Sequence, residues 1–255
     1  MALLFFALAS LEQVPSALVV IPRQPAARLL AVGTDQAPGV LINCTVGAPP
    51  FAAPDPSRFS VVIVHGINPC HPFMHLEMAQ RYGEAIGAVW GSHLNVMGWD
   101  WNANSMRGPF PLRNAALAER QGRAMAEALL RAGLAPESLH LVGQSSGCIV
   151  AASAARVIAD RCGRPVDRLT LLDPRTGHHP IVFEKLQAGT AARIVDHLWA
   201  TGPSGFGSDA PYANVRNLAV IGPSGWAGFL TPESLDHMQL VQWHIGQMAA
   251  NPWGL

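Results

Sequence analysis

The feature that most constrains the fold of this chain is a regular alternation of short apolar runs with helical segments after residue 59. The run 60–64, SVVIV, is continuous and β-branched, which is typical of a strand buried on both faces. Further strands are predicted at 94–101, 139–142, 169–172, 192–200 and 215–221, and helices at 74–90, 114–132, 148–161 and 238–248. This order predicts an α/β fold with a mostly parallel sheet and helices on both faces, which binds ligands at the carboxyl ends of its strands.

The first part of the chain has a different pattern. Short apolar runs at 17–22, 28–32 and 40–45 predict a β-rich opening, and the proline- and alanine-rich stretch 48–56 predicts a loop. Within 1–20, MALLFFALAS resembles the apolar part and cleavage site of a signal peptide, although no Lys or Arg precedes Arg23. A mis-assigned start codon and a plain hydrophobic first segment are the alternatives. We expect one domain over 1–255, with a leaning toward a secreted or extracytoplasmic location.

The composition excludes several classes of function. With 17 basic and 17 acidic residues and no basic run, the chain lacks the electrostatic surface for nucleic acid. No run reaches the roughly 20 apolar residues that span a bilayer, so no transmembrane segment is expected. The four cysteines contain no C-x-x-C pair and fit either buried thiols or one or two disulfides in an exported protein. His71 and His75 have the i, i+4 spacing of metal ligands but no third ligand, so we expect neither a metal nor a cofactor.

One motif carries chemistry. The predicted strand 139–142 continues into the sequence GQSSG and then into a helix of small residues. This is G-x-S-x-G between a strand and a helix, where a serine sits on a sharp, strained turn with its hydroxyl above the sheet. The flanking residues must be small, because side chains there would collide with the strand and the helix. Ser145 is the expected nucleophile rather than Ser146, since it alone is bracketed symmetrically by the glycines. A Gly/Ser turn kept for packing is the alternative.

A serine hydroxyl needs a base that a carboxylate orients, and in this fold the chain order is Ser, then Asp or Glu, then His. His178 and His179 follow the acid candidate too closely, and His197 lies inside an apolar run. His237 comes after the last predicted strand and just before the last helix, so it is the expected base. His244, two turns into that helix, is the alternative.

The acid is chosen by its place in the chain. Asp173 directly follows the run 169–172 and precedes a proline, which puts it at the carboxyl end of a strand. Asp196 lies within a strand, and Asp236 is adjacent to the expected base. Asp173 is therefore the expected acid, and Asp209, in a later Gly/Pro/Ser loop, is the alternative. An Asp-Pro turn that merely ends the strand is the structural alternative.

Two backbone N–H groups are expected to hold the oxyanion. One belongs to the residue after the nucleophile, Ser146, and the other comes from the loop after an earlier strand. The run 60–64 continues into HGIN, so the N–H of Ile67 is the expected second donor. His65 is expected to hold this loop by hydrogen bonds.

These residues resemble the lipases of the α/β-hydrolase fold, specifically the pancreatic lipase-like group. The resemblance covers residues 59–248 and rests on HGIN, NVMGWDW, SLHLVGQSSG, LTLLDPRTG, ARIVDHLWAT and DHMQLVQWHIGQM. It implies Ser145 as nucleophile, Asp173 as acid and His237 as base, with Ile67 and Ser146 as oxyanion donors. It therefore favours Asp173 over Asp209.

The chain departs from that group in several places. The usual histidine before the nucleophile is Gln144. The segment 222–236 is short and has no cysteine pair, so no long disulfide-closed lid is expected. Acidic residues for structural calcium are not evident between 178 and 190, and the C-terminal β-sandwich is expected to be absent.

The resemblance and the triad imply hydrolysis of lipid or other acyl esters through an acyl-enzyme. An apolar pocket is expected from loop residues, which also suit contact with a lipid surface or ordinary packing. These residues are Phe73, Met74, Phe110, Trp226, Phe229 and Leu230. The alternatives are a thioesterase, an amidase, a cutinase-like polyester hydrolase and a catalytically silent binding protein of the same fold. Trp99 and Trp101 are expected to pack in the core rather than to bind a sugar.

Overall fold

The computed structural model describes residues 39–67, 74–101, 105, 111–200, 212–220 and 234–252. Gln36–Leu255 form one compact unit, and the other unit, Met1–Asp35, lies outside the described residues. The runs expected at 17–22 and 28–32 and the signal-like segment 1–20 therefore lie outside them as well. The single domain over 1–255 stays a prediction.

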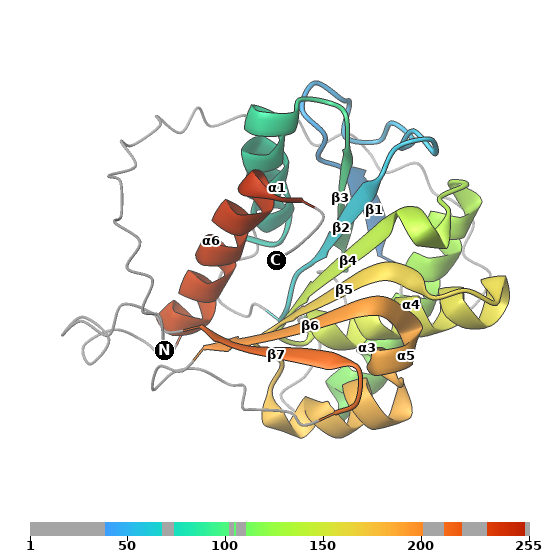
Figure 1. Cartoon of the computed structure of the whole chain (residues 1–255), viewed down its shortest axis with the longest axis vertical. Helices are drawn as coiled ribbons and strands as arrows, with labels where there is room; N and C mark the ends of the chain where they lie inside the picture. The colour runs from blue at the N-terminus through green and yellow to red at the C-terminus, as the bar shows by residue number, and fades with distance from the viewer. Residues whose placement is uncertain are drawn as a thin grey trace. The chain divides into compact units, whose positions relative to one another are not determined.

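In the described chain, seven strands form one sheet with the spatial order β1-β3-β2-β4-β5-β6-β7 (Figure 1). The strands are β1 (Val40–Asn43), β2 (Ser60–Val64), β3 (Asn95–Asp100), β4 (Leu139–Gln144), β5 (Val166–Leu172), β6 (Ala192–Ala200) and β7 (Val215–Val220). β1 pairs antiparallel with β3, and the other neighbours pair in parallel. Because parallel strands end at the same edge, the segments that follow β2, β4, β5 and β6 meet there.

Helices cover both faces of the sheet, as Figure 1 shows. On one face, α1 (Met74–Trp90) packs beside α6 (Ser234–Ala250). On the other face lie α3 (Pro111–Arg131), α4 (Gly147–Cys162) and the short α5 (Ala188–Ala191). A 3₁₀ turn at Pro136–Ser138 leads into β4, and a 3₁₀ turn at Thr176–His178 and a π-helical turn at Pro180–Lys185 follow β5.

The central strand β2 shows why the sequence is apolar at every position there. Val61 and Ile63 point into the core under α1 and α6, whereas Val62 and Val64 point into the core under α3 and α4. Every residue of β2 is buried. A strand covered on both faces needs apolar side chains at odd and even positions alike, so the prediction made from SVVIV is confirmed.

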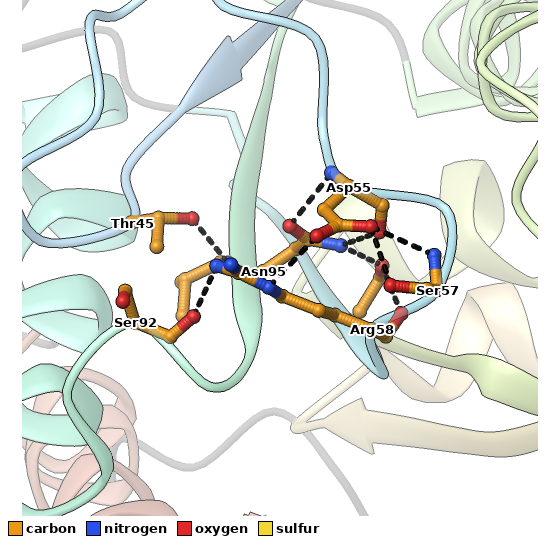
Figure 2. Close-up of polar contacts among 8 residues, drawn as sticks. Thr45, Asp55, Ser57, Arg58, Ser92 and Asn95 are labelled. Carbon is orange, nitrogen blue, oxygen red and sulfur yellow. Dashed lines mark hydrogen bonds and ion pairs between the residues drawn. The ribbon is translucent and has the colours of Figure 1, made fainter.

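The loop 48–56 is tied to the amino ends of β2 and β3 by a polar cluster around Asn95 (Figure 2). The Asn95 side chain accepts a hydrogen bond from the N–H of Asp55 at 3.1 Å and donates to the Asp55 carbonyl at 2.7 Å. Arg58 donates to the carbonyl of Ser92 and pairs with the Asp55 carboxylate at 3.0 Å. These contacts lie at the edge of the sheet opposite the carboxyl ends of the strands.

Polar side chains gather on the sheet face that α1 and α6 cover, and all of them except the half-exposed Arg216 are buried. Asp196 accepts from Arg168 at 2.6 Å through one oxygen and from Arg216 at 2.6 Å through the other. His140 Nε2 lies 2.8 Å from the Thr170 hydroxyl. The strand register brings these residues together, because His140 pairs with Arg168 and Thr170 pairs with Asp196. We call Arg168, Asp196, Arg216, His140 and Thr170 the polar layer. These residues lie along the strands, before their carboxyl ends.

Several element boundaries differ from the prediction: β5 starts at Val166 rather than at 169 and α3 at Pro111 rather than at 114. Two further differences concern the candidate site. The last helix starts at Ser234 rather than at 238, so His237 lies within the first turn of α6 and not before the helix. Strand β4 continues past 142 to Gln144, because Gly143 still pairs with Val64 of β2. Pairing in the sheet outweighs the weak strand preference of glycine. The expected α/β fold, with a mostly parallel sheet and helices on both faces, is confirmed.

Candidate active site

Ser145 lies at the turn between β4 and α4 in a left-handed conformation, with a φ of 54°. This conformation costs a non-glycine residue about 1–2 kcal/mol, so the surrounding structure must impose it. The N–H of Ser145 donates to the carbonyl of Leu172 at 2.9 Å, and its own carbonyl accepts from the N–H of Cys148 at 3.0 Å. The strained turn predicted from the G-x-S-x-G motif is confirmed.

The two glycines of the motif are required by close backbone contacts. A Cβ atom at Gly143 would lie 2.6 Å from the carbonyl oxygen of Gly147. A Cβ atom at Gly147 would lie 2.5 Å from the carbonyl oxygen of Val64. Both distances are too short for non-bonded atoms, so a side chain at either position would push α4 away from the sheet. The predicted need for small flanking residues is confirmed.

The loop after β2 lies directly beside this turn. The N–H of Gly66 donates to Gln144 Oε1 at 2.9 Å, and a Cβ atom at Gly66 would lie 2.7 Å from Ser145 Cβ. The buried ring of His65 bonds the Gly66 carbonyl at 2.8 Å and accepts from the N–H of Trp101 at 3.3 Å. The expectation that His65 holds the loop by hydrogen bonds is confirmed.

Asp173 follows β5 at the same edge and also has a positive φ, 48°. Its side chain is fully buried, and Oδ1 accepts from the N–H of Ala200 at 3.3 Å. Because Gln144 pairs with Leu172 across β4 and β5, Ser145 and Asp173 are the next residues of two adjacent strands. Two left-handed residues therefore stand side by side at the ends of neighbouring strands, where strain most often serves function.

A cysteine lies beneath the turn without the properties of a nucleophile. The Cys148 thiol donates to the carbonyls of Gly143 at 3.2 Å and Leu172 at 3.6 Å. Burial, and then the charge of Asp173, raise the pKa of this thiol well above its ordinary value. Cys148 thus stays neutral and packs as a small apolar residue. Cys44 and Cys162 are free thiols too, and Cys70 lies outside the described residues.

The alternative base, His244, lies against the polar layer. Its Nδ1 is 2.7 Å from the Tyr82 hydroxyl, and the residue is buried. Burial, followed by the charge of Arg168, lowers the pKa of His244 to about 3. The ring also faces His140, whose pKa is lowered chiefly by burial and then by His244. His140 precedes Ser145 by about 16 Å of extended strand. The choice between His237 and His244 as the base stays a prediction.

Other predicted site residues lie outside the described part of the chain. These are Asp209, His71, Phe73, Phe110, Trp226, Phe229 and Leu230, together with the side chains of Met74, His75 and His237. The base role of His237 and the choice between Asp173 and Asp209 therefore stay predictions. The oxyanion roles of Ile67 and Ser146 stay predictions as well.

The remaining candidates of the sequence belong to the core. Trp99 and Trp101 are buried, as expected. His197 is buried in β6 and bonds Asn217 at 2.8 Å. Among the residues that the structure describes, no group of His, Cys, Asp and Glu side chains is arranged to hold a metal ion. No helix in the same residues is long and apolar enough to cross a membrane.

The contact of the Gln144 side chain with the loop after β2 was not predicted from the sequence. In the sequence, Gln144 stood out only because the pancreatic lipase-like group usually has a histidine at this position. Its place at the end of β4 offers a signal, because the last residues of a parallel strand face the loop that follows the neighbouring strand.

The strand order and the turn at Ser145 match those expected for an α/β-hydrolase fold, and some solved enzymes resemble the chain at low identity. No protein-family model matches the chain, and no curated protein is significantly similar to it. An esterase from Pyrobaculum calidifontis is 16% identical over 83% of this chain and 82% of its own, with a TM-score of 0.41. The esterase Est2 from the Planctomycetes species Thermogutta terrifontis is 13% identical over 84% and 88%, with a TM-score of 0.42.

A thioesterase is similar to the same extent. RedJ, from the prodiginine biosynthetic pathway in Streptomyces coelicolor, is 19% identical over 79% of this chain and 96% of its own, with a TM-score of 0.45. At such identities the likeness concerns the fold, and it singles out no lipase group.

Proposed function

We propose that this chain is a serine hydrolase that cleaves carboxylic esters through an acyl-enzyme on Ser145. The observation that carries the proposal is the left-handed Ser145 at the turn after β4, next to glycines whose places admit no side chain. Backbone strain of this kind persists where the surrounding structure must hold a side chain in one orientation. The turn also lies at the carboxyl edge of a parallel sheet, which is the edge where such folds bind ligands.

In the proposed mechanism, His237 takes the proton of Ser145 Oγ as this oxygen attacks the ester carbonyl. Asp173 keeps the imidazole oriented, and the N–H groups of Ile67 and Ser146 hold the oxyanion. The alcohol leaves with the proton from His237. A water molecule, deprotonated by the same imidazole, then attacks the acyl-enzyme and releases the acid and Ser145.

We further propose short- to medium-chain acyl esters as substrates, with lipid esters as the wider class. Support comes from Asp173, because it follows the strand that pairs directly with the nucleophile strand. This is the position of the acid that the pancreatic lipase-like resemblance implies. The apolar residues that the sequence predicts to lie in loops, such as Phe110 and Trp226, would suit an acyl pocket and contact with a lipid surface.

The experiment compares two adjacent hydroxyls. In Ser145→Ala we expect kcat for p-nitrophenyl esters to fall by about 10⁴-fold or more, with loss of labelling by a fluorophosphonate. Ser146→Ala is the matched control, because it removes a neighbouring hydroxyl and keeps the backbone N–H. Retained activity in Ser145→Ala, or a folded wild type that neither labels nor hydrolyses, would contradict the proposal.

The acid and the substrate class are tested in the same assay. We expect Asp173→Asn to lower kcat far more than Asp209→Asn, and His237→Ala far more than His244→Ala. The reverse order in either pair would reassign that role. Cleavage of acyl thioesters without cleavage of oxygen esters would contradict the ester assignment and favour a thioesterase.

A further inference from the structure

The two peptide groups that flank Gly66 are both held by side chains. The N–H of Gly66 donates to Gln144 Oε1 at 2.9 Å. The carbonyl of Gly66 accepts from His65 Nδ1 at 2.8 Å. Because a trans peptide is planar, the carbonyl of Gly66 and the N–H of Ile67 point in opposite directions. Holding that carbonyl therefore aims the N–H of Ile67, the proposed oxyanion donor.

The hydrogen bonds of His65 determine its tautomer. Nδ1 faces a carbonyl oxygen, so Nδ1 carries the proton. Nε2 is then free to accept from the N–H of Trp101 at 3.3 Å, while the Asp100 carboxylate lies 3.6 Å from the same nitrogen, beyond hydrogen-bond reach. The indole N–H of Trp101 donates to the carbonyl of His65 at 2.8 Å, and the two rings stack with centroids 5.7 Å apart. The ring thus has one orientation.

Gln144 differs from His65 because it connects two separate segments. Its backbone precedes Ser145 on the nucleophile strand, and its side chain holds the loop that follows β2. Gln144 is buried, and a Cβ atom at Gly66 would lie 2.6 Å from its Oε1 and 2.7 Å from Ser145 Cβ. The space between the loop and the turn therefore admits no side chain at position 66, and the amide of Gln144 fills it.

We propose that Gln144 is a positioning residue that sets the distance between the Ser145 hydroxyl and the N–H of Ile67. This inference rests on the proposed ester hydrolysis and adds a residue to its machinery. A displaced oxyanion donor weakens the transition state far more than the ground state. Loss of the Gln144 acceptor therefore lowers kcat and leaves KM nearly unchanged.

The test removes the acceptor and keeps the shape. We expect Gln144→Met to lower kcat and the rate of fluorophosphonate labelling by about 10- to 100-fold, since displacements below 1 Å have effects of this size. KM should stay within about threefold. Gln144→Glu keeps an acceptor oxygen at the same place, and we expect it to recover most of the lost rate.

The chain offers a matched control in Gln121. This second buried glutamine also accepts from a glycine N–H, that of Gly39, at 2.8 Å. Gln121→Met therefore loses the same kind of hydrogen bond away from the proposed site. We expect it to lower the melting temperature about as much as Gln144→Met does and to leave kcat unchanged. Equal kcat values in wild type and folded Gln144→Met would overturn the proposal.

Amide hydrogen exchange separates this inference from the proposed function. If Gln144 holds the loop, the N–H of Gly66 exchanges faster in Gln144→Met than in wild type and stays slow in Gln121→Met. Unchanged exchange at Gly66 would overturn the positioning role, even with an active enzyme. Should the wild type fail to label at Ser145, the ester hydrolase is wrong, while the exchange result still decides whether Gln144 holds the loop.

Discussion

The sheet buries polar groups in two regions that differ in their backbone. In the polar layer, Arg168 and Asp196 lie on regular strands, and their charges are paired side by side. At the carboxyl edge, Ser145 and Asp173 both have a positive φ. Burial of polar groups is common to both regions, so burial alone does not identify a site. Backbone strain at the ends of adjacent strands distinguishes the candidate active site from the layer that serves the fold.

Within the polar layer, we expect substitution of Asp196 to lower the stability most, because its two oxygens bond both Arg168 and Arg216. Removing one member of a buried ion pair leaves the other charged and desolvated. We expect Asp196→Ala to lower the free energy of unfolding by about 3–5 kcal/mol, measured by urea denaturation. The specific activity of the folded fraction should not change.

Asp167 provides the control for that loss. It pairs with Arg193 at 2.7 Å, and the side chain of Arg193 is 63% exposed. The Asp167 side chain is only 15% exposed. We still expect Asp167→Ala to cost less than about 1 kcal/mol, because Arg193 stays in solvent when its partner is removed and solvent screens the pair. If the two variants lose equal stability, the polar layer is not a buried electrostatic unit.

Acid tests the same comparison, because the polar layer contains His140 and lies against His244, and both rings are neutral in the folded protein. The folded-state pKa of His244 is about 3, below its ordinary value of 6.5, and that of His140 is also lowered. The unfolded chain therefore binds more protons below pH 6.5. The stabilisation is complete above this pH and falls toward acid by about 1.4 kcal/mol per pH unit for each histidine.

The measurement is the slope of the free energy of unfolding plotted against pH. We expect His244→Gln to reduce the slope between pH 6.5 and 4 by about one proton, whatever its stability at neutral pH. The groups packed around this ring include Tyr82, His140 and Arg168. The remaining slope reports on His140 together with His178 and His179, whose pKa values burial also lowers. An unchanged slope would show that His244 already carries its proton in the folded protein.

The smallest expected effect concerns the strained turn itself. Glycine has no Cβ to clash in the left-handed region. We therefore expect the free energy of unfolding of Ser145→Gly to be about 1 kcal/mol higher than that of Ser145→Ala. Ser153 in α4 is the control, since glycine in a helix interior is about 1 kcal/mol less stable than alanine. The two sites should therefore show opposite signs, and the same sign at both would exclude strain at Ser145.

Much of the fold followed from local patterns. The β-branched run of β2 and the small residues around Ser145 report on burial and on steric limits that act within a few residues. The boundaries were less certain, because Gly143 continues β4 only through its partner Val64. The start of α6 at Ser234 was likewise not predicted, because the prediction rested on the spacing of apolar residues, which begins later.

The sequence by itself determined a parallel sheet between helices and a strained serine at the carboxyl end of a strand, because spacing and side-chain size encode both locally. Only the tertiary structure decided that Gln144 holds Gly66, 78 residues away, and that His244 bonds Tyr82, 162 residues away. Such contacts depend on which strands are neighbours and in what register. That arrangement is a property of the whole packed sheet, and no local pattern carries it.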